Sequence, residues 1–248
     1  MERAAIKFIQ SLSQKKIRDE HRLFIVEGEK LVEELLHTNF IIQKIVYTKK
    51  VSFATPPQIS EQVSEAVMER LSAFKTPPTI LAVVENPHEQ RLPKLSNDEL
   101  YLALDNIQDP GNLGTIMRIA DWFGIRHIFC SLDTVDCFNS KVVQATMGAI
   151  FRTRVHYIDL AKFLQETEKT IPIYGTFLDG ENIYQQTLTK GGIIVMGNEG
   201  KGISPEVAAT VSSRLFIPSY LGQQSSESLN VAASTAILCA EFRRRIGN

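Results

Sequence analysis

The stretch GGIIVMGNEGKGIS, residues 191–204, decides the fold of this chain. Its apolar run Ile193–Met196 is followed at once by a polar turn rich in glycine, and a second apolar run, Leu215–Ile217, ends in the same way at Pro218. Each run is typical of a buried strand, and the loops that follow carry the polar residues Asn198, Glu199, Ser228 and Asn230. Because α/β sheets bind ligands at the carboxyl ends of their strands, these loops are candidates for a binding site.

The same pattern extends upstream as far as residue 100. With helical stretches between them, strands are expected over Tyr101–Leu104, Arg126–Phe129, Arg154–Tyr157 and Ile173–Phe177. The first helix begins near Asn112, where an N-cap side chain is expected, and its apolar face is formed by Leu113, Ile116, Met117 and Ala120. Strands that alternate with helices predict an α/β domain with a parallel sheet.

The first 85 residues form a smaller α/β pattern that we expect to be a separate domain. Strands are expected over Leu23–Val26, Ile42–Tyr47 and Thr79–Val84, and helices over Arg3–Leu12, Glu29–Leu36 and Glu61–Leu71. A basic turn with Lys15, Lys16 and Arg18 follows the first helix. Residues 86–99 are polar, contain two prolines and lack periodicity, so they are the expected linker to a second domain over residues 100–248.

The composition is that of an ordinary globular protein, with 44% hydrophobic and 22% charged residues among 248. No apolar run approaches the length of a membrane span, and residues 1–16 lack the apolar core of a signal peptide. The three cysteines form no CxxC pair and no histidines or cysteines have metal-ligand spacing, so no metal site is expected. These features predict a protein of the reducing cytoplasm.

Motifs of several common enzyme classes are missing from the sequence. No GxGxxG follows the strand over 101–104, which excludes the dinucleotide fingerprint, and GNEGKGIS lacks the spacing of a P-loop. The absence of GxSxG leaves a serine hydrolase without support. The net charge of −1 does not indicate a nucleic-acid binder, but basic residues cluster near the N-terminus and at Arg243–Arg245, and the distribution of charge matters more than its sum.

Three polar loops of the second domain hold the candidate site residues. Residues 105–124 supply Asn112 and Arg118, residues 195–204 supply Glu199, and residues 217–234 supply Ser228 and Asn230. Structural interpretations exist too, because Asn112 and Ser228 could cap helices and Arg118 could pair with Asp121. The functional interpretation is favoured, since all three loops fall at strand ends or helix starts of one sheet.

These residues carry a resemblance to a known family. The motifs NLGTIMRIADWFG (112–124), IIVMGNEGKGIS (193–204) and IPSYLGQQSSESLNVAASTAIL (217–238) occur in order. With them, the chain resembles the TrmH/SpoU family of RNA 2′-O-ribose methyltransferases, within the SPOUT superfamily. The stretch RDEHRLFIVEGEKLVEELL (18–36) is similar to the RNA substrate-binding domain often fused ahead of that family's domain, which has a fold akin to ribosomal protein L30e.

The resemblance implies a fold, a cofactor and partners. The domain from residue 100 onward would be a trefoil-knotted α/β domain, one of the rare exceptions to the absence of knots, and a second subunit would help to complete each site of a homodimer. S-adenosylmethionine would be held, mostly through backbone groups, by Thr176, Leu178, Met196, Gly197, Ile217, Pro218 and Leu229. Structured RNA is the implied substrate, and the extra N-terminal domain favours rRNA over tRNA.

The implied chemistry assigns roles to the polar residues. A ribose 2′-hydroxyl is a weak nucleophile that needs its proton drawn off, but arginine is a poor base in isolation because it is always protonated. We therefore expect Arg118 to act on the hydroxyl together with a neighbouring RNA phosphate. Asn112 would position Arg118 or the ribose, while Glu199, Ser228 and Asn230 would bind substrate and order the loops. The candidate RNA contacts are Arg18, Arg22, Lys30 and Lys141.

Other functions stay open at this point. A catalytically idle RNA-binding homologue would keep the fold, and a base methyltransferase of the wider superfamily would use the same cofactor. The presence together of Asn112, Arg118, Glu199 and Asn230 favours an active ribose methyltransferase, since a protein that only binds RNA has no need of all four.

Overall fold

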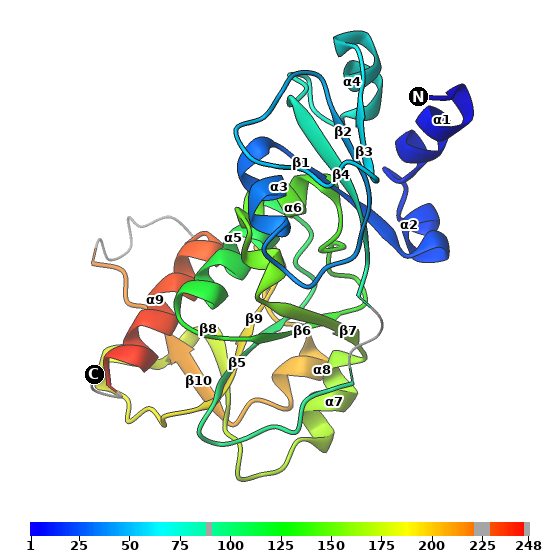
Figure 1. Ribbon diagram of the computed structural model, residues 1–248. Helices are drawn as coiled ribbons and strands as arrows, with labels where there is room; N and C mark the ends of the chain where they lie inside the picture. The colour runs from blue at the N-terminus through cyan, green and yellow to red at the C-terminus, as the bar shows by residue number, and fades with distance from the viewer. Residues whose placement is uncertain (88–90, 221–228, 246–248) are drawn as a thin grey trace. The chain divides into compact units, whose positions relative to one another are not determined.

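A computed structural model describes residues 1–87, 91–220 and 229–245 of the chain, which divides into two compact units (Figure 1). Unit 1 comprises Met1–Gln90 with Asp136–Phe151, and unit 2 comprises Arg91–Val135 with Arg152–Asn248. The domain predicted over residues 100–248 includes residues 136–151, whereas in the structure these residues pack within unit 1. The first unit is therefore assembled from two separate parts of the chain.

Unit 1 is built on a four-stranded mixed sheet in the order β1-β4-β2-β3. Its strands are β1 (Leu23–Glu27), β2 (Ile42–Tyr47), β3 (Ser60–Gln62) and β4 (Ile80–Glu85). Its helices are α1 (Arg3–Ser11), α2 (Lys15–His21), α3 (Glu29–Leu35), α4 (Glu65–Leu71) and α6 (Ser140–Thr146), followed by the 3-10 turn η1 (Ala149–Phe151). The helix expected over Glu61–Leu71 is wrong at its start, because Ser60–Gln62 pair with β2 as an edge strand.

Aromatic side chains hold the segment 136–151 inside unit 1. The ring centroid of Phe138 lies 4.6 Å from that of Phe24 on β1, and the ring of Phe151 lies 5.5 Å from that of Phe40. The helix α6 packs against β1 and buries Val142 and Val143. Apolar burial of this kind, rather than position in the sequence, assigns the segment to the first unit.

Arg18 is a structural residue of unit 1 and not the RNA contact that the sequence predicted. It lies on α2, in the stretch expected to be a turn, and only 4% of it is exposed. Its guanidinium pairs with Asp136 at 2.5 Å and donates to the backbone carbonyls of Leu12 and Ser13 at 2.9 and 2.8 Å. Because the group is buried and its donors are engaged, a phosphate cannot reach it, and the prediction for Arg18 is wrong.

Unit 2 contains a six-stranded sheet in which every neighbouring pair is parallel, in the order β10-β8-β9-β5-β6-β7. Its strands are β5 (Leu100–Leu104), β6 (His127–Ser131), β7 (Arg154–Ile158), β8 (Ile173–Asn182), β9 (Gly192–Met196) and β10 (Ser213–Phe216). Its helices are α5 (Pro110–Trp122), α7 (Leu160–Glu166), α8 (Pro205–Ala208) and α9 (Val231–Arg244), with the 3-10 turn η2 (Ile183–Gln185) after β8. The predicted α/β class with a parallel sheet is confirmed.

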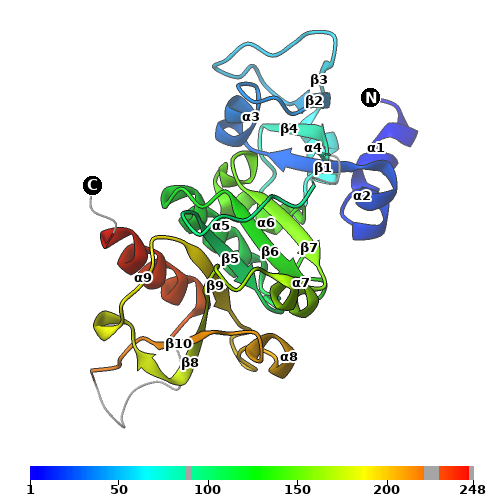
Figure 2. The same ribbon diagram turned by 90° about the horizontal axis from the view of Figure 1, so that it is seen from below.

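Helices cover both faces of this sheet. Figures 1 and 2 show α5 and α9 side by side on one face and α7 and α8 on the other. Tyr101 and Ala103 of β5 join the core cluster with Leu160 and Leu164 of α7. On the opposite side, α5 buries the face that the sequence predicted: Leu113, Ile116, Met117 and Ala120. Burial on both faces explains why the strands are continuous apolar runs.

The described residues include no helix that is both long enough and apolar enough to cross a lipid bilayer. The knot implied by the family resemblance stays a prediction.

Candidate active site

The polar loops of unit 2 meet at one edge of the sheet. Because β5, β9, β8 and β10 are parallel, the segments after Leu104, Met196 and Phe216 all leave the sheet at the same edge. The first two are joined directly, since the backbone N–H of Asp105 donates to the carbonyl of Met196 at 2.9 Å. This edge is where the sequence analysis placed the site.

The loop between β9 and α8 is a tight turn built around Asn198. The side-chain amide of Asn198 donates to the Asn106 carbonyl at 2.8 Å, and its oxygen accepts from the backbone N–H groups of Gly200 and Lys201 at 3.0 Å. At Gly197 a Cβ would lie 2.3 Å from the carbonyl carbon of Gly202, so a side chain there would displace backbone. The turn thus needs glycine at 197, and it presents Glu199 at its exposed tip.

Three of the predicted catalytic residues form one hydrogen-bonded chain. Asn112, near the start of α5, donates from Nδ2 to Oε1 of Glu199 at 2.5 Å. Asn230 donates from Nδ2 to Oδ1 of Asn112 at 3.0 Å. The Oδ1 of Asn230 in turn accepts from the backbone N–H groups of Ala232 and Ala233 at 3.0 and 3.2 Å. One amide, that of Asn112, therefore links loops that are 87 and 118 residues distant along the chain.

The expectation that Asn112 caps α5 is wrong. The helix begins earlier, at Pro110, and Asp109 is its N-cap, whose carboxylate accepts from the backbone N–H of Asn112 at 2.8 Å. The side chain of Asn112 is consequently left for contacts with other loops. The N-cap of α9 is Asn230, whose side chain also belongs to the polar chain through its hydrogen bond to Asn112.

Arg118 stands apart from this polar chain. It is exposed on α5 and has no hydrogen-bond or ion-pair partner within residues 1–87, 91–220 and 229–245. The ion pair with Asp121 does not form, because Arg152 holds that carboxylate at 2.8 Å. Six residues along a helix correspond to about 9 Å of rise and about 240° of rotation, so Arg118 and Asn112 face different directions. The structure therefore does not bring Arg118 to the other predicted catalytic residues of the same chain.

The predicted cofactor residues lie on the strands and loops at this edge. Met196 is buried at the end of β9, and Thr176, Gly197, Ile217 and Pro218 are half-buried. The hydroxyl of Thr176 donates to the carbonyl of Val195 at 3.4 Å.

Two apolar side chains among the predicted cofactor residues are open to solvent, with Leu178 74% and Leu229 51% exposed. Adenosine needs apolar surface for its ring and polar atoms for its base edge and ribose, and exposed leucines next to loop backbone supply both. The residues present thus fit S-adenosylmethionine. Ser228 lies outside the described residues.

The remaining RNA predictions fall on exposed residues of unit 1. Lys30 lies on α3 and Lys141 on α6, and both are exposed. Arg22 is exposed too, and it adopts a left-handed backbone conformation (φ 53°) where α2 ends. These three stay predictions.

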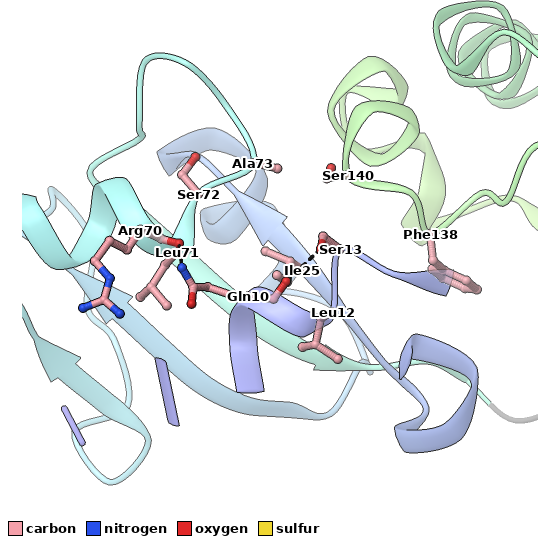
Figure 3. Close-up of a pocket in the computed structure, with 10 residues that line it drawn as sticks. All are labelled: Gln10, Leu12, Ser13, Ile25, Arg70, Leu71, Ser72, Ala73, Phe138 and Ser140. Carbon is pink, nitrogen blue, oxygen red and sulfur yellow. Dashed lines mark hydrogen bonds between the residues drawn. The ribbon is translucent and has the colours of Figure 1, made fainter. Parts of the chain in front are cut away.

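One pocket of unit 1 has a volume of about 230 Å³, and none of its lining residues belongs to the polar loops of unit 2 (Figure 3). Apolar walls come from Leu12, Ile25 and Leu71, and polar groups from Gln10 and Ser72. Gln10 is engaged with the Arg70 carbonyl at 2.8 Å, and Ser72 donates to the buried Glu27 at 2.5 Å. Burial raises the pKa of Glu27, and the Ser72 hydroxyl stabilises its charged form. Gln10 and Ser72 thus both make hydrogen bonds within unit 1.

One polar residue at the sheet edge, Asp105, is not among the predicted site residues. Asp105 is only 5% exposed, and its carboxylate accepts from the backbone N–H of Ser204 at 2.7 Å. It thereby ties the end of β5 to the start of α8. The signal was available, because an acidic residue directly after a buried strand is a feature of sites at strand ends.

Comparison with protein families gives two matches that divide the chain. Residues 99–240 match the model of the SpoU rRNA methylase family. Residues 3–82 match the model of an MRM3-like substrate binding domain. The first match contains the three loops described above.

Individual proteins match over nearly the whole chain. RlmP of Bacillus subtilis (strain 168), a 23S rRNA (guanosine(2553)-2′-O)-methyltransferase, is 32% identical over 243 residues, with 96% of this chain and 95% of RlmP covered. A TrmH-family protein from Porphyromonas gingivalis has a solved structure that is 42% identical, with a TM-score of 0.86 and 99% of both chains covered. An AdoMet-bound rRNA methyltransferase from Sinorhizobium meliloti is 29% identical, with a TM-score of 0.82 and with 99% of this chain and 96% of that chain covered.

Proposed function

Because the chain belongs to the SpoU rRNA methylase family, we propose that it transfers the methyl group of S-adenosylmethionine to the 2′-hydroxyl of a ribose in ribosomal RNA. The name of the B. subtilis relative states this class of reaction on 23S rRNA, and the S. meliloti structure contains the cofactor. The match to a substrate binding domain over residues 3–82 supports structured RNA as the substrate. We place the enzyme in the cytoplasm, as the cysteine content favours.

The observation that carries the proposal is the polar chain of Glu199, Asn112 and Asn230. Asn230 also caps α9, but the hydrogen bonds that Asn112 makes with Glu199 and Asn230 are exposed to water, so folding gains little from them. As binding groups the three residues are well arranged, because each is held by a neighbour and keeps further hydrogen-bonding capacity. They form a preordered surface for the sugar and phosphate groups of RNA.

The donor side of the reaction depends on the loops after β9 and β10. When bound, S-adenosylmethionine supplies a methyl group on a positively charged sulfonium, which needs only a nucleophile in line with it. Gly197 and Ile217 offer backbone groups at the sheet edge, and Leu178 and Leu229 offer apolar surface. These residues would hold the donor and exclude water from one of its sides.

The acceptor side depends on Arg118. Its guanidinium has no partner within the described part of the chain, so it is available to an RNA phosphate and to the adjacent 2′-hydroxyl. A fixed positive charge next to that hydroxyl favours its deprotonated form, and the phosphate can accept the proton. Arg118 thus orients and acidifies the nucleophile, whereas a free base is not needed.

We infer that the enzyme acts as a homodimer in which one subunit brings Arg118 to the polar chain of the other. The support is the angular separation of about 120° between Asn112 and Arg118 around α5, since a rotation of about 240° one way is about 120° the other way. Mixing subunits tests this directly. If sites are shared, two inactive variants, Asn112→Ala and Arg118→Ala, regain about a quarter of wild-type activity after random reassociation, since half the dimers then contain one intact site. If each site lies within one chain, the mixture stays inactive.

The function is tested by methyl transfer from labelled S-adenosylmethionine to purified rRNA and, separately, to tRNA. We expect label in rRNA, released by digestion as a 2′-O-methyl nucleoside. Arg118→Ala should abolish transfer at saturating cofactor, while Lys201→Ala, a cation in the adjacent loop, should not. Label recovered in a methylated base would contradict the proposal, and label in tRNA alone would replace rRNA as the substrate.

A further inference from the structure

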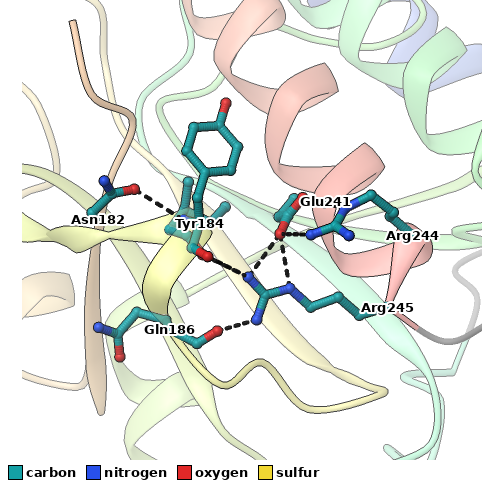
Figure 4. A network of polar contacts seen from close by, with 7 residues as sticks. Asn182, Tyr184, Gln186, Glu241, Arg244 and Arg245 are labelled. Carbon is teal, nitrogen blue, oxygen red and sulfur yellow. Dashed lines mark hydrogen bonds and ion pairs between the residues drawn. The ribbon is translucent and has the colours of Figure 1, made fainter.

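The last turn of α9 is fastened to the turn that follows β8 by one arginine (Figure 4). Arg245 donates from Nη2 to the backbone carbonyls of Ile183 and Tyr184 at 3.0 and 3.3 Å, and from Nη1 to the carbonyl of Gln186. Three carbonyls of one short segment are thus held by a single guanidinium. This segment includes the 3-10 turn η2, which the side chain of Asn182 caps by accepting from the N–H of Tyr184.

A buried carboxylate fixes the orientation of that arginine. Glu241 is only 6% exposed, and its Oε1 accepts from Nε of Arg245 at 2.8 Å. The neighbouring Arg244 also pairs with Glu241, at 2.8 Å, but its side chain is 67% exposed and, among the described residues, it makes no hydrogen bond or ion pair with η2. The two arginines therefore share an acid, and only Arg245 connects that acid to the turn.

The fastened turn directly follows β8, the strand that carries the predicted donor-binding residues Thr176 and Leu178. The backbone pairing of β8 with β9 covers Ile173–Gly175 only, so apart from the hydroxyl of Thr176, which donates to the carbonyl of Val195 at 3.4 Å, the residues from Thr176 to Leu178 are not paired with β9. The strand pairs with β10 again at Glu181 and Asn182, which lie opposite Leu215 and Phe216, just before Ile217. The end of β8 therefore lies beside the end of β10, just before the predicted cofactor residues Ile217 and Pro218, and the arginine contacts begin one residue after Asn182.

We propose that Arg245 is a positioning residue for the methyl-donor site, acting through the turn at 183–186. By holding three carbonyls after Asn182, it fixes the far end of the segment that carries Thr176 and Leu178, so the segment is ordered before the donor binds. Preordering a loop in its bound conformation increases affinity because the ordering entropy is not lost on binding. The opposite end of α9 carries Asn230, so this helix supports both the donor side and the polar chain. The inference rests on the proposed use of S-adenosylmethionine.

The test compares Arg245→Met with the matched control Arg244→Met. Calorimetric titration with S-adenosylmethionine, without RNA, should show a dissociation constant about tenfold larger for Arg245→Met, which corresponds to roughly 1.4 kcal/mol. Arg244→Met should bind as the wild type does. Hydrogen exchange of the amides at 177–187 should be faster in Arg245→Met only, and kcat at saturating donor should change little.

A second variant keeps the test informative if Arg245→Met does not fold. Arg245→Lys retains a charge for Glu241, but an ammonium cannot span three carbonyls, so the same loss of donor affinity is expected. Unchanged donor affinity in both variants overturns the inference, as does an equal loss in Arg244→Met. Failure of the wild type to bind S-adenosylmethionine would instead refute the proposed function, which keeps the two outcomes distinct.

Discussion

Replacing Asn112 by aspartate tests the polar chain with almost no change in shape. The amide Nδ2 that donates to Glu199 at 2.5 Å becomes a carboxylate oxygen, which cannot donate and carries a like charge. The lost charge-assisted hydrogen bond is worth on the order of 1.5–3 kcal/mol. Repulsion between two partly exposed carboxylates adds on the order of 1 kcal/mol, since water screens them.

A loss of about 3 kcal/mol in the positioning of the acceptor corresponds to roughly a hundredfold lower methyl-transfer rate. The assay is single-turnover transfer from labelled S-adenosylmethionine to rRNA, between about pH 5 and pH 8. Two carboxylates this close share a proton as the pH falls, and the protonated pair regains a donor. Asn112→Asp should therefore recover part of its rate at low pH relative to the wild type.

The control is Asn112→Ala, which also breaks the chain but has no group to protonate, so its relative rate should not rise at low pH. Asn112→Asp activity within threefold of the wild type at pH 8 would refute the reasoning. A deficit independent of pH would show that the contact with Glu199 is not the cause.

Three further outcomes are expected. Arg18→Ala should lower the free energy of unfolding of unit 1 by about 3–5 kcal/mol, because it leaves the carboxylate of Asp136, which is only 10% exposed, without its cation, and urea unfolding monitored by hydrogen exchange of α1 and α2 checks this. The hydrogen bond from Arg244, with that from Arg245, lowers the pKa of Glu241 to about 2 from its ordinary 4.5. The ionised Glu241 therefore stabilises the folded state fully above pH 4.5, and this contribution to the free energy of unfolding is lost as the pH falls toward 2. Thermal melts across this window should show a steeper acid loss in the wild type than in Glu241→Gln. Asn230→Asp should keep the cap of α9 but lose the hydrogen bond to Asn112, so its melting temperature should stay near that of the wild type while methyl transfer falls. Asn230→Ala should lose the cap as well and be less stable by about 1 kcal/mol, which separates the capping role of Asn230 from its role in the polar chain.

Much of the fold was predictable because its strands are buried on both faces. A continuous apolar run such as Ile193–Met196 indicates a buried strand without any knowledge of the strands that pair with it. The predicted bounds of β2 are the observed ones. The errors come from contacts distant in sequence. Ser60–Gln62 follow a helical pattern locally, but their pairing with β2 makes them a strand. In the same way, the segment 136–151 belongs to unit 1 through aromatic contacts that no local pattern encodes.

The candidate site was predictable in its residues but not in its connections. Motif spacing indicated Asn112, Glu199 and Asn230, and the structure brings them together. The spacing could not show that Asp109, three residues earlier, takes over the capping role, because Asp and Asn are nearly equivalent caps. A basic cluster likewise cannot separate an RNA contact from a buried arginine, and Arg18 proved to be the latter.

The central claim is that this chain methylates one class of ribose in rRNA, and the most direct measurement is a map of ribose methylation across total RNA from cells with and without the protein. The account predicts that a 2′-O-methyl group disappears from rRNA in its absence and returns with the wild type, but not with Arg118→Ala. An unchanged methylation map of rRNA, or the loss of a methylated base instead, would contradict it.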